Sequence, residues 1–363
     1  MGLSMEAFIT DDGTVAKFIH ADGSETAVKV VKSCSNFKNA ETGTLDTEWV
    51  DRNKYSVFIS ASLGCYLACK FCHLTIKGSA YKKLYTDQVV ANVKEAILFE
   101  IARKPEMKDR YVKLCWMGMG DALNQPDMVY DATLELMDWL MSNGYTRGLD
   151  CVDLSTVLPK VGDAWIERFR ELNVALEAYP VNPESFRIEQ AEVSTVKEYT
   201  GRTRFRMFYS VHSAIQDTRE KMVPRAMLIA DAVPLLKRFQ ENGGPNLLLH
   251  TVFVEGLNDG PDEVDRLIDF LGEHFPENEL RVLRYNFCDR SPYREIDHID
   301  RAVSKIAEHH SALKVQTSAG KEVAAACGQF LVAFPKSVGK NIRIHVEPVP
   351  SEEHTPVALA NEP

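Results

Sequence analysis

Residues 55–72 read YSVFISASLGCYLACKFC, and this stretch decides the fold. The apolar run at residues 57–59 predicts a short buried strand. A loop with a CxxxCxxC spacing follows directly, and its three cysteines are Cys65, Cys69 and Cys72. Residues 86–103 then place apolar side chains at helical spacing, which predicts an amphipathic helix. The stretch and its flank therefore read as a strand, a cysteine loop and a helix.

The alternation of strands and helices continues toward the C-terminus. Further strands are predicted at residues 111–116, 150–155, 173–178, 206–212, 247–254, 280–286 and 312–317. Further helices are predicted near residues 127–142, 163–171, 227–241, 261–273 and 297–310. Repeated strand–helix units require a parallel sheet with crossover helices, either open or curled into a full or partial barrel. In such folds ligands bind at the carboxyl ends of the strands.

The two ends of the chain differ from this central α/β pattern. Residues 7–32 alternate apolar and polar positions around two Asp-Gly turns, which predicts a β-hairpin or small meander, and residues 33–53 are predicted to be a loop. We therefore expect three parts. They are residues 1–53, the sheet-forming residues 54–318, and a C-terminal segment 319–363 that ends in a mobile tail.

The composition is that of an ordinary soluble globular protein, with 45% hydrophobic and 26% charged residues in a chain of 363. No apolar run is long enough for a membrane span and no secretory signal is visible, so we expect a cytoplasmic protein without a membrane partner. The formal charge of −10 would repel phosphate backbones, so nucleic-acid binding would need a local basic patch. The candidates for such a patch are Lys77, Lys82, Lys83, Arg202, Arg204 and Arg206.

The cysteine cluster favours an iron–sulfur centre. Three thiolates leave one coordination position unfilled, and this suits a 4Fe-4S cluster whose fourth iron is open to a substrate or cofactor. A structural zinc site with His73 as the fourth ligand is one alternative, although the adjacent Cys72 and His73 would both have to reach one ion. A chance grouping of inert cysteines is the other alternative.

Seven short motifs in register with the cysteines identify a resemblance. They are GMGD at 118–121, STV at 155–157, YSVHS at 209–213, REKMVP at 219–224, VEGLND at 254–259, YN at 285–286 and AACGQ at 325–329. The cysteine spacing resembles the radical S-adenosylmethionine (SAM) superfamily. The motif order resembles the RlmN and Cfr family of RNA adenine methyltransferases, from the early hairpin to about residue 330.

The resemblance implies a fold, an activity and two cofactors. The fold would be a partial (β/α)6 barrel at residues 54–318 with a small N-terminal β-hairpin extension. The enzyme would hold a 4Fe-4S cluster on the three cysteines, cleave SAM to a 5'-deoxyadenosyl radical, and methylate adenine in tRNA or rRNA. The electron would come from a reducing partner such as flavodoxin or ferredoxin.

The resemblance also implies roles for individual residues. Gly118, Gly120 and Asp121 would receive the amino group of SAM, although Asp121 could instead simply cap a helix in a tight turn. The carboxylate, ribose and adenine of SAM would be contacted by Ser155, Ser210, His212 and Asn286. Ser155 and His212 also have an ordinary interpretation, as polar residues satisfied within the protein.

Cys327 in the AACGQ segment is the implied catalytic residue. In the family this cysteine takes a methyl group from one SAM and presents it for hydrogen abstraction by a radical made from a second. Such a thiol must act as a nucleophile, and the small residues beside it would allow close approach. The alternative is a buried cysteine in an alanine-rich turn.

The sequence departs from the family pattern at several places. Phe58 stands where the family has a second catalytic cysteine, seven residues before Cys65, and Asp121 stands where the family usually has Glu. The sequence starts near the hairpin that follows the N-terminal helical module in the family, so we expect that module to be absent, and residues 179–205 look like an insertion. Either another thiol replaces the one absent at Phe58, or the chemistry ends differently. The candidates are Cys34, Cys115, Cys151 and Cys288, and each of them could instead be a buried small hydrophobic residue.

Three hypotheses about function follow. The first is a methyl synthase that uses Cys327 on an RNA adenine, which the AACGQ segment favours. The second keeps the cluster and SAM site but acts on a peptide, protein or small molecule by hydrogen abstraction or altered methyl transfer, which Phe58 and the acidic composition favour. The third, a structural or sensor cluster, leaves the SAM-site residues without a purpose.

Overall fold

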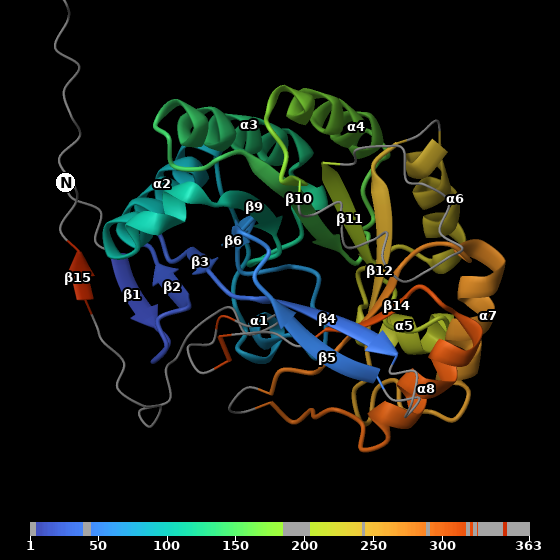
Figure 1. Cartoon of the computed structure of the whole chain (residues 1–363). Coiled ribbons are helices and arrows are strands. Elements are labelled where there is room, and N and C mark those ends of the chain that lie inside the picture. The colour runs from blue at the N-terminus through green and yellow to red at the C-terminus, as the bar shows by residue number, and fades with distance from the viewer. Residues whose placement is uncertain are drawn as a thin grey trace, which may run out of the picture.

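The computed structural model describes residues 5–38, 45–183, 204–241, 244–287, 291–316, 320–321, 325 and 344–346, with the backbone alone for residues 33–38, 45–49 and 344–346. Within these ranges one sheet has the strand order β14-β13-β12-β11-β10-β9-β6-β3-β2-β1-β15 (Figure 1). Its strands from β6 to β14 pair parallel. Their bounds are β6 Lys54–Ile59, β9 Tyr111–Trp116, β10 Leu149–Thr156, β11 Phe205–Ser210, β12 Asn246–Val252, β13 Leu280–Leu283 and β14 Leu313–Gln316.

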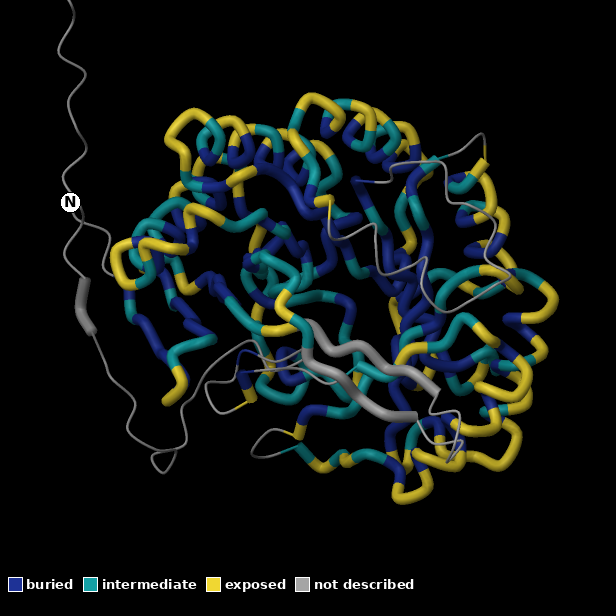
Figure 2. The backbone as a smooth tube through the Cα atoms, in the orientation of Figure 1, coloured by how far each residue is buried: buried dark blue, intermediate teal, exposed yellow. Residues whose placement is uncertain are grey.

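Helices connect the parallel strands and follow one another around the outside of the curved sheet (Figure 1). The principal helices are α2 Thr86–Arg103, α3 Pro126–Ser142, α4 Trp165–Ala175, α5 Gln216–Met222, α6 Ile229–Gln240, α7 Glu263–His274 and α8 Ile299–His309. The shorter helices are α1 His73–Ile76 and the 3-10 turns η1 Pro105–Asp109, η2 Ala122–Asn124 and η3 Leu176–Ala178. Their inner faces are buried against the sheet and their outer faces are exposed (Figure 2). This arrangement confirms the predicted α/β fold with a parallel sheet.

The N-terminal meander extends the sheet. It consists of β1 Met5–Ile9, β2 Val15–Ile19 and β3 Glu25–Lys29, and β3 pairs antiparallel with β6. The strand β15 Ile344–Val346 pairs with β1 at the edge, and β7 Ser62–Leu63 pairs with β8 Lys82–Lys83 beside the cysteine loop. The meander expected at residues 7–32 is therefore present and is continuous with the main sheet.

Two expectations about secondary structure were wrong. Residues 33–53 are not a loop, because β4 Ser33–Lys38 and β5 Leu45–Val50 form an antiparallel hairpin. Residues 173–178 are not a strand but the end of α4 and the turn η3. The buried residues Phe169, Leu172 and Leu176 recur at helical spacing, so one apolar stripe continues through this segment.

Among the described residues, no helix combines the length and apolar character that crossing a bilayer requires.

Candidate metal and cofactor site

The cysteine loop follows β6 and β7 at the carboxyl edge of the parallel sheet, and α1 begins directly after it. Its backbone turns sharply, because both Gly64 and Ala68 have positive φ, of 57° and 58°. A Cβ on Gly64 would lie 2.3 Å from the carbonyl oxygen of Ala80. Since real Cβ atoms do not approach oxygen so closely, a glycine is required where the loop begins.

Contacts from four separate elements hold this loop in place. Tyr66 Oη donates to Asn124 Oδ1 at 2.7 Å, and the backbone N–H of Lys70 donates to the carbonyl oxygen of Met222 at 2.8 Å. Tyr285 Oη donates to the carbonyl oxygen of Phe71 at 3.2 Å. The ring of Phe71 also meets the His212 ring edge to face, with 4.9 Å between centroids. The loop is thus fixed against η2, α5 and the ends of β11 and β13.

The motif GMGD at 118–121 packs against residues 59–62, which lead into the cysteine loop. A Cβ on Gly118 would lie 2.7 Å from the carbonyl oxygen of Ile59, and one on Gly120 would lie 2.0 Å from Ser62 Oγ. Met119 between them donates its N–H to Ser60 Oγ at 3.2 Å and accepts from the N–H of Ala61 at 2.8 Å. These glycines therefore let the turn at 118–121 pack closely against residues 59–62, just before the cysteine loop.

The three loop thiols lie close enough to affect one another electrostatically. Burial, followed by the charges of Cys72 and Asp121, raises the pKa of Cys65 to about 12. Burial raises the pKa of Cys69 well above its usual value, and the charges of Cys72 and Cys65 raise it further. Because three neighbouring thiolates are unfavourable without a compensating cation, this donor set fits a group that carries positive metal charge.

No three His, Cys, Asp or Glu side chains among the described residues are placed to hold one metal ion together. The combination of the cysteines with His73 that a zinc site would need is therefore not formed. In a 4Fe-4S cluster each thiolate ligates iron of a polynuclear centre, and soft thiolates are its usual ligands. The three grouped, partly buried thiols fit such a cluster.

Asp121 follows β9 near the cysteine loop, and each of its carboxylate oxygens accepts at least one hydrogen bond. Oδ1 accepts from the N–H of Leu123 at 3.1 Å, so the expected helix-capping interaction is present at η2. Oδ2 accepts from Thr156 Oγ1 at 2.9 Å and from the N–H of Val157 at 3.0 Å. Burial raises the pKa of Asp121 to about 6, although all three hydrogen bonds lower it.

The remaining predicted SAM contacts lie at the carboxyl ends of neighbouring strands. Ser155 and Ser210, on β10 and β11, have their hydroxyl oxygens 3.3 Å apart. His212 is buried with φ of 56°, and its Nδ1 has no hydrogen-bond partner among the described residues. Burial, with the charge of Arg219, lowers the pKa of His212 to about 3, so its ring is neutral. Asn286 is buried beyond β13. Because buried polar groups normally have a hydrogen-bond partner, the Nδ1 of His212 is suited to bind a polar ligand at this edge.

Arg219 is a site residue that the sequence analysis left unassigned, although it opens the REKMVP motif. Its side chain is 1% exposed. Its Nη1 donates to the carbonyl oxygen of Ser210 at 2.9 Å and its Nη2 to that of Val157 at 2.7 Å. Arg219 therefore joins the ends of β10 and β11 beside the predicted SAM contacts. The signal for it was a charged residue inside a matched motif.

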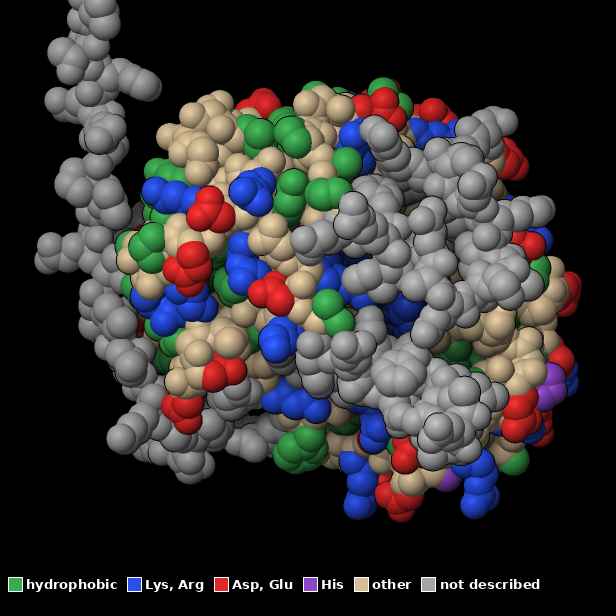
Figure 3. All heavy atoms as spheres, viewed as in Figure 1, with side chains coloured by type: hydrophobic (Ala, Val, Ile, Leu, Met, Phe, Trp, Pro, Cys, Tyr) green, Lys and Arg blue, Asp and Glu red, His purple; other side chains and the backbone are tan. Residues whose placement is uncertain are grey.

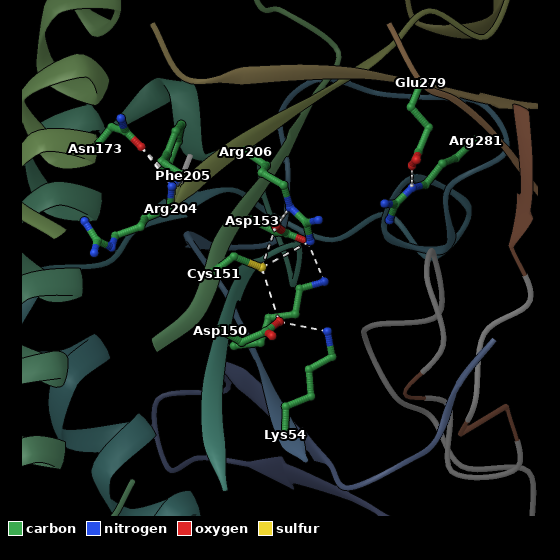
Figure 4. Close-up of polar contacts among 11 residues, drawn as sticks. Lys54, Asp150, Cys151, Asp153, Asn173, Arg204, Phe205, Arg206, Glu279 and Arg281 are labelled. Atoms are coloured by element: carbon green, nitrogen blue, oxygen red, sulfur yellow. Dashed lines mark hydrogen bonds and ion pairs between the residues drawn. The ribbon is translucent and has the colours of Figure 1, made fainter. Parts of the chain in front are cut away.

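Below this edge an ion-pair network lines the inner wall of the sheet (Figure 4). Asp153 has a fully buried side chain and pairs with Lys113 at 2.5 Å and Arg206 at 2.8 Å. Nearby, Lys54 pairs with Asp150 at 2.8 Å. Lys and Arg side chains extend across the middle of the face shown in Figure 3. Arg206 forms an ion pair within this network. It therefore does not belong to the basic surface patch for which it was a candidate.

The cysteines that could replace the thiol absent at Phe58 lie in different surroundings. Lys29 Nζ, from β3, lies 4.4 Å from the centroid of the Phe58 ring. On the other neighbouring strand, β9, the register partner of Phe58 is Cys115. Burial raises the pKa of Cys115 to about 11. Cys151 lies in the ion-pair network, 3.3 Å from Asp153 Oδ1. The side chain of Cys34 and the residues Cys288 and Cys327 lie outside the described part of the chain.

The start of the segment that carries Cys327 is described at Ala325. Ala325 is fully buried, accepts from Lys29 Nζ at 2.8 Å through its carbonyl oxygen, and donates its N–H to the carbonyl oxygen of Gly320 at 2.8 Å. It belongs to a small apolar cluster against which Phe58, Cys65 and Cys72 also pack. The chain two residues before Cys327 is therefore anchored beside the cysteine loop.

Comparison with curated proteins supports the motif assignment. The chain is 22% identical over 276 residues to a probable dual-specificity RNA methyltransferase RlmN of Chlorobium phaeovibrioides, covering 75% of this chain and 64% of that protein. It is 24% identical over 295 residues to a probable dual-specificity RNA methyltransferase RlmN 3 of Opitutus terrae, covering 79% of this chain and 68% of that protein. It is 27% identical over 287 residues to a probable RNA methyltransferase of Rhodopirellula baltica, covering 75% and 62%. The chain thus spans about two thirds of the length of these relatives.

Comparison with solved structures concerns the fold. A radical SAM methyltransferase from Sphaerobacter thermophilus superposes with a TM-score of 0.59 at 18% identity, covering 88% of this chain and 78% of that one. No family model matches the chain. The chain has the fold of a radical SAM methyltransferase and resembles RNA methyltransferases of the RlmN type, as its motifs indicated.

Proposed function

We propose that this chain is a radical SAM enzyme that methylates an adenine in RNA. In this proposal Cys65, Cys69 and Cys72 hold a 4Fe-4S cluster, and Cys327 carries the methyl group. When bound, the cluster supplies the electron that cleaves SAM to a carbon-centred radical. The names of the relatives, which are probable RNA methyltransferases, support the substrate class.

The observation that carries the proposal is the meeting of two sets of residues at one edge of the sheet. The cysteine loop follows β6, and the polar residues Asp121, Ser155 and Ser210 belong to the next strands at the same edge. The charge of Asp121 acts on both Cys65 and Cys69. A cofactor bound by these polar side chains would therefore lie next to the thiols, as electron transfer to it requires.

The chain's own residues have distinct tasks in this proposal. A carboxylate accepts about four hydrogen bonds, and three are made to Asp121, so one position remains for the ammonium group of SAM. The hydroxyls of Ser155 and Ser210 can donate to its carboxylate. The neutral His212 can hydrogen-bond the ribose or adenine without adding charge. Arg219 fixes the strand ends that present these groups.

The test is a product analysis under anaerobic conditions. The reconstituted and reduced protein is incubated with SAM, and 5'-deoxyadenosine and S-adenosylhomocysteine are measured. A methyl synthase gives both products, together with a methyl group on Cys327 in the mass spectrum. A protein that holds no iron, or that gives neither product, contradicts the proposal.

A second candidate keeps the cluster and SAM but acts on a peptide, protein or small molecule. Phe58 favours it, because an aromatic ring under Lys29 cannot take the part of a thiol. A hydrogen-abstracting enzyme of this kind gives 5'-deoxyadenosine without S-adenosylhomocysteine. Comparison of modified nucleosides from cells with and without the protein separates the two substrates, because only the RNA enzyme changes the methyladenosine content.

A further inference from the structure

A row of polar side chains starts beside Ser210 and crosses the last three strands of the parallel sheet. Ser210 on β11 pairs in register with His250 on β12, which pairs with Arg281 on β13. Arg281 in turn pairs with Lys314 on β14. Register partners point to the same face of a sheet. We call His250, Arg281 and Lys314 the inner row. In the strand order it leads away from β6 and the cysteine loop.

The chemistry of the inner row is unusual for its place in the fold. Barrels built from strand–helix units normally fill their inner face with branched apolar side chains. Here three neighbouring strands place an imidazole, a guanidinium and an ammonium group there. None of the three residues belongs to one of the seven matched motifs, so the resemblance gives them no role. Polar groups at such positions call for a polar partner.

His250 offers an unused hydrogen-bonding atom. The residue is 4% exposed, and its Nε2 has no hydrogen-bond partner among the described residues. Its ring stacks on that of Phe208, with 4.4 Å between centroids and 22° between planes. Burial, with the charges of Arg281 and His212, lowers the pKa of His250 well below its usual value, so the ring is neutral. A buried nitrogen of this kind is suited to hydrogen-bond an uncharged polar group of a ligand.

The two cations of the inner row share one carboxylate. Arg281 Nε donates to Glu279 Oε1 at 2.5 Å (Figure 4), and Lys314 Nζ pairs with Glu279 Oε2 at 2.5 Å. Burial would raise the pKa of Glu279, but Arg281 and Lys314 lower it to about 2, so it is ionised at neutral pH. Two positive charges thus meet one negative charge, which leaves one positive charge to attract an anion.

Arg281 is also placed to use this charge beside His250. Its guanidinium carbon lies 4.7 Å from the centroid of the Phe208 ring, the same ring on which His250 stacks. A guanidinium has five N–H donors, and planar donor pairs of this kind match the oxygens of a phosphate. A group that binds an anion and a group that binds a neutral polar edge therefore lie side by side.

We propose that the inner row binds the nucleotide that accepts the methyl group, with His250 hydrogen-bonding its base and Arg281, assisted by Lys314, binding its phosphate. The inference rests on the proposed function, because that function needs an acceptor beside the bound SAM. Ser210, a predicted SAM contact, is the register partner of His250. The acceptor would thus lie on the side of SAM that is turned away from the three cysteines.

The first test compares adenosine 5'-monophosphate with adenosine, which differ only in the phosphate. Both are titrated into the cluster-loaded protein with excess S-adenosylhomocysteine, so that the SAM site is filled. We expect the phosphate to raise the affinity about tenfold in the unchanged protein and Arg281→Gln to abolish this preference. Arg281→Lys should retain part of it, because the charge remains. The matched control, Arg301→Gln, removes an arginine at an exposed position of α8 and should keep the preference.

The second test separates the base contact of His250 from its packing. Phenylalanine in its place can still stack on Phe208 but has no ring nitrogen. We expect His250→Phe to bind adenosine and its monophosphate about fivefold more weakly, with the preference for phosphate unchanged. His250→Gln should bind both ligands more tightly than His250→Phe, because its amide can hydrogen-bond the base.

Three results would overturn the inference. The first is an unchanged protein that binds the two ligands equally well, and the second is an Arg281→Gln variant that keeps the preference for phosphate. The third is a loss of affinity for S-adenosylhomocysteine in His250→Phe or Arg281→Gln as large as the loss for the nucleotide. This third result would assign the inner row to the SAM site itself.

The two proposals fail in different ways. If dithionite-reduced protein does not cleave SAM, the proposed function fails, whatever the nucleotide titrations give. If the protein cleaves SAM and Arg281→Gln keeps the preference for phosphate, the assignment of the inner row alone is wrong.

Discussion

At the scale of single residues, the ionised carboxylate of Asp121 destabilises the folded protein because it is buried. Its pKa is raised to about 6 from the ordinary value of 3.8, with burial as the main cause. Between these two values the folded protein keeps a proton that the unfolded chain has lost. The free energy of unfolding therefore falls as the pH rises through this window, by up to about 3 kcal/mol.

Replacing Asp121 with Asn removes this pH dependence. We expect the stability of Asp121→Asn relative to the unchanged protein to improve by up to about 3 kcal/mol between pH 4 and pH 7. Urea unfolding of the cluster-free protein at four pH values measures it. A difference between Asp121→Asn and the parent that is the same at every pH would contradict the raised pKa.

Cys69 is the loop thiol whose loss tests the cluster assignment most directly. It is the middle cysteine of the motif, and Cys72 donates its N–H to the carbonyl oxygen of Cys69 at 3.1 Å. We expect Cys69→Ala to lower the iron content after reconstitution from about four atoms per chain to nearly none. Cys115→Ala should keep its iron, since Cys115 belongs to β9. A brown Cys69→Ala protein with full iron content would refute the assignment.

Single residues were predictable where local spacing decides their chemistry. The grouping of Cys65, Cys69 and Cys72 follows from a short loop, so the sequence was sufficient for it. The sequence predicts Asp121 either as a contact of SAM or as a helix cap. In the structure its Oδ2 also accepts a hydrogen bond from Thr156 of the next strand. Such a contact joins residues 35 positions apart and depends on strand order, which local patterns do not contain. The clamp made by Arg219 was missed for the same reason.

At the scale of elements, the fit between the turn at 118–121 and the strand end before the cysteine loop depends on Gly120. Its φ is 85°, and a Cβ there would lie 2.0 Å from Ser62 Oγ. We expect Gly120→Ala to cost about 2 kcal/mol or more of stability and to lower cluster occupancy, because either Ser62 or the loop must move. Denaturant unfolding and iron analysis measure the two effects.

Gly144 gives the matched control for this substitution. It also has positive φ, of 61°, but nothing lies within 4 Å of its Cβ position. Gly144→Ala should therefore cost about 1 kcal/mol from backbone strain alone and should leave the iron content unchanged. If the two variants lost the same stability and kept the same iron, the contact with Ser62 would be unimportant.

The ion pairs across β9, β10 and β11 depend on one carboxylate. Burial alone would raise the pKa of Asp153, but Arg206 and Lys113 together lower it well below its usual range. Asp153 therefore stays ionised in the folded protein at any pH above its ordinary value. We expect Asp153→Asn to destabilise the protein by about 3 kcal/mol, because two mostly buried cations lose their partner. Urea unfolding at neutral pH measures the loss. Since the unfolded chain gains a proton only near pH 4, the difference should shrink only below that pH.

Elements were predictable from the sequence where one periodicity is unambiguous. The helix predicted at residues 86–103 has these bounds in the structure, because its apolar residues recur at helical spacing throughout. Residues 173–178 are predicted as a strand because a short apolar run fits a strand or a helix. In the structure the apolar stripe of α4 continues through them, so they end that helix and form η3. The hairpin β4–β5 was missed because its strands are polar, so no apolar alternation marks them.

At the scale of the whole molecule, the meander and the parallel strands share one hydrophobic core. Phe18 and Val28 from the meander belong to the same buried cluster as Val57 and Leu114 from the sheet. We therefore expect one cooperative unfolding transition for the described sheet. Far-ultraviolet circular dichroism and tryptophan fluorescence should give coincident urea curves. An earlier, separate loss of amide protection in residues 5–29 would contradict this expectation.

The α/β fold class could be inferred from the sequence, while the contacts between distant segments that build the site could not. Alternating strands and helices require a parallel sheet, and the carboxyl edge of that sheet is where ligands bind. The pairing of β3 with β6, and the approach of Ala325 to Lys29 across 296 positions, are non-local contacts. They depend on how the remaining surfaces fit together, which no local pattern encodes.

The close packing of Gly118 against the backbone of Ile59 and of Gly120 against Ser62 has a practical consequence for protein engineering. A Cβ at either position would collide with residues 59–62, which lead into the cysteine loop. A combinatorial library aimed at new substrates therefore has to keep both glycines unchanged, whichever other positions it varies.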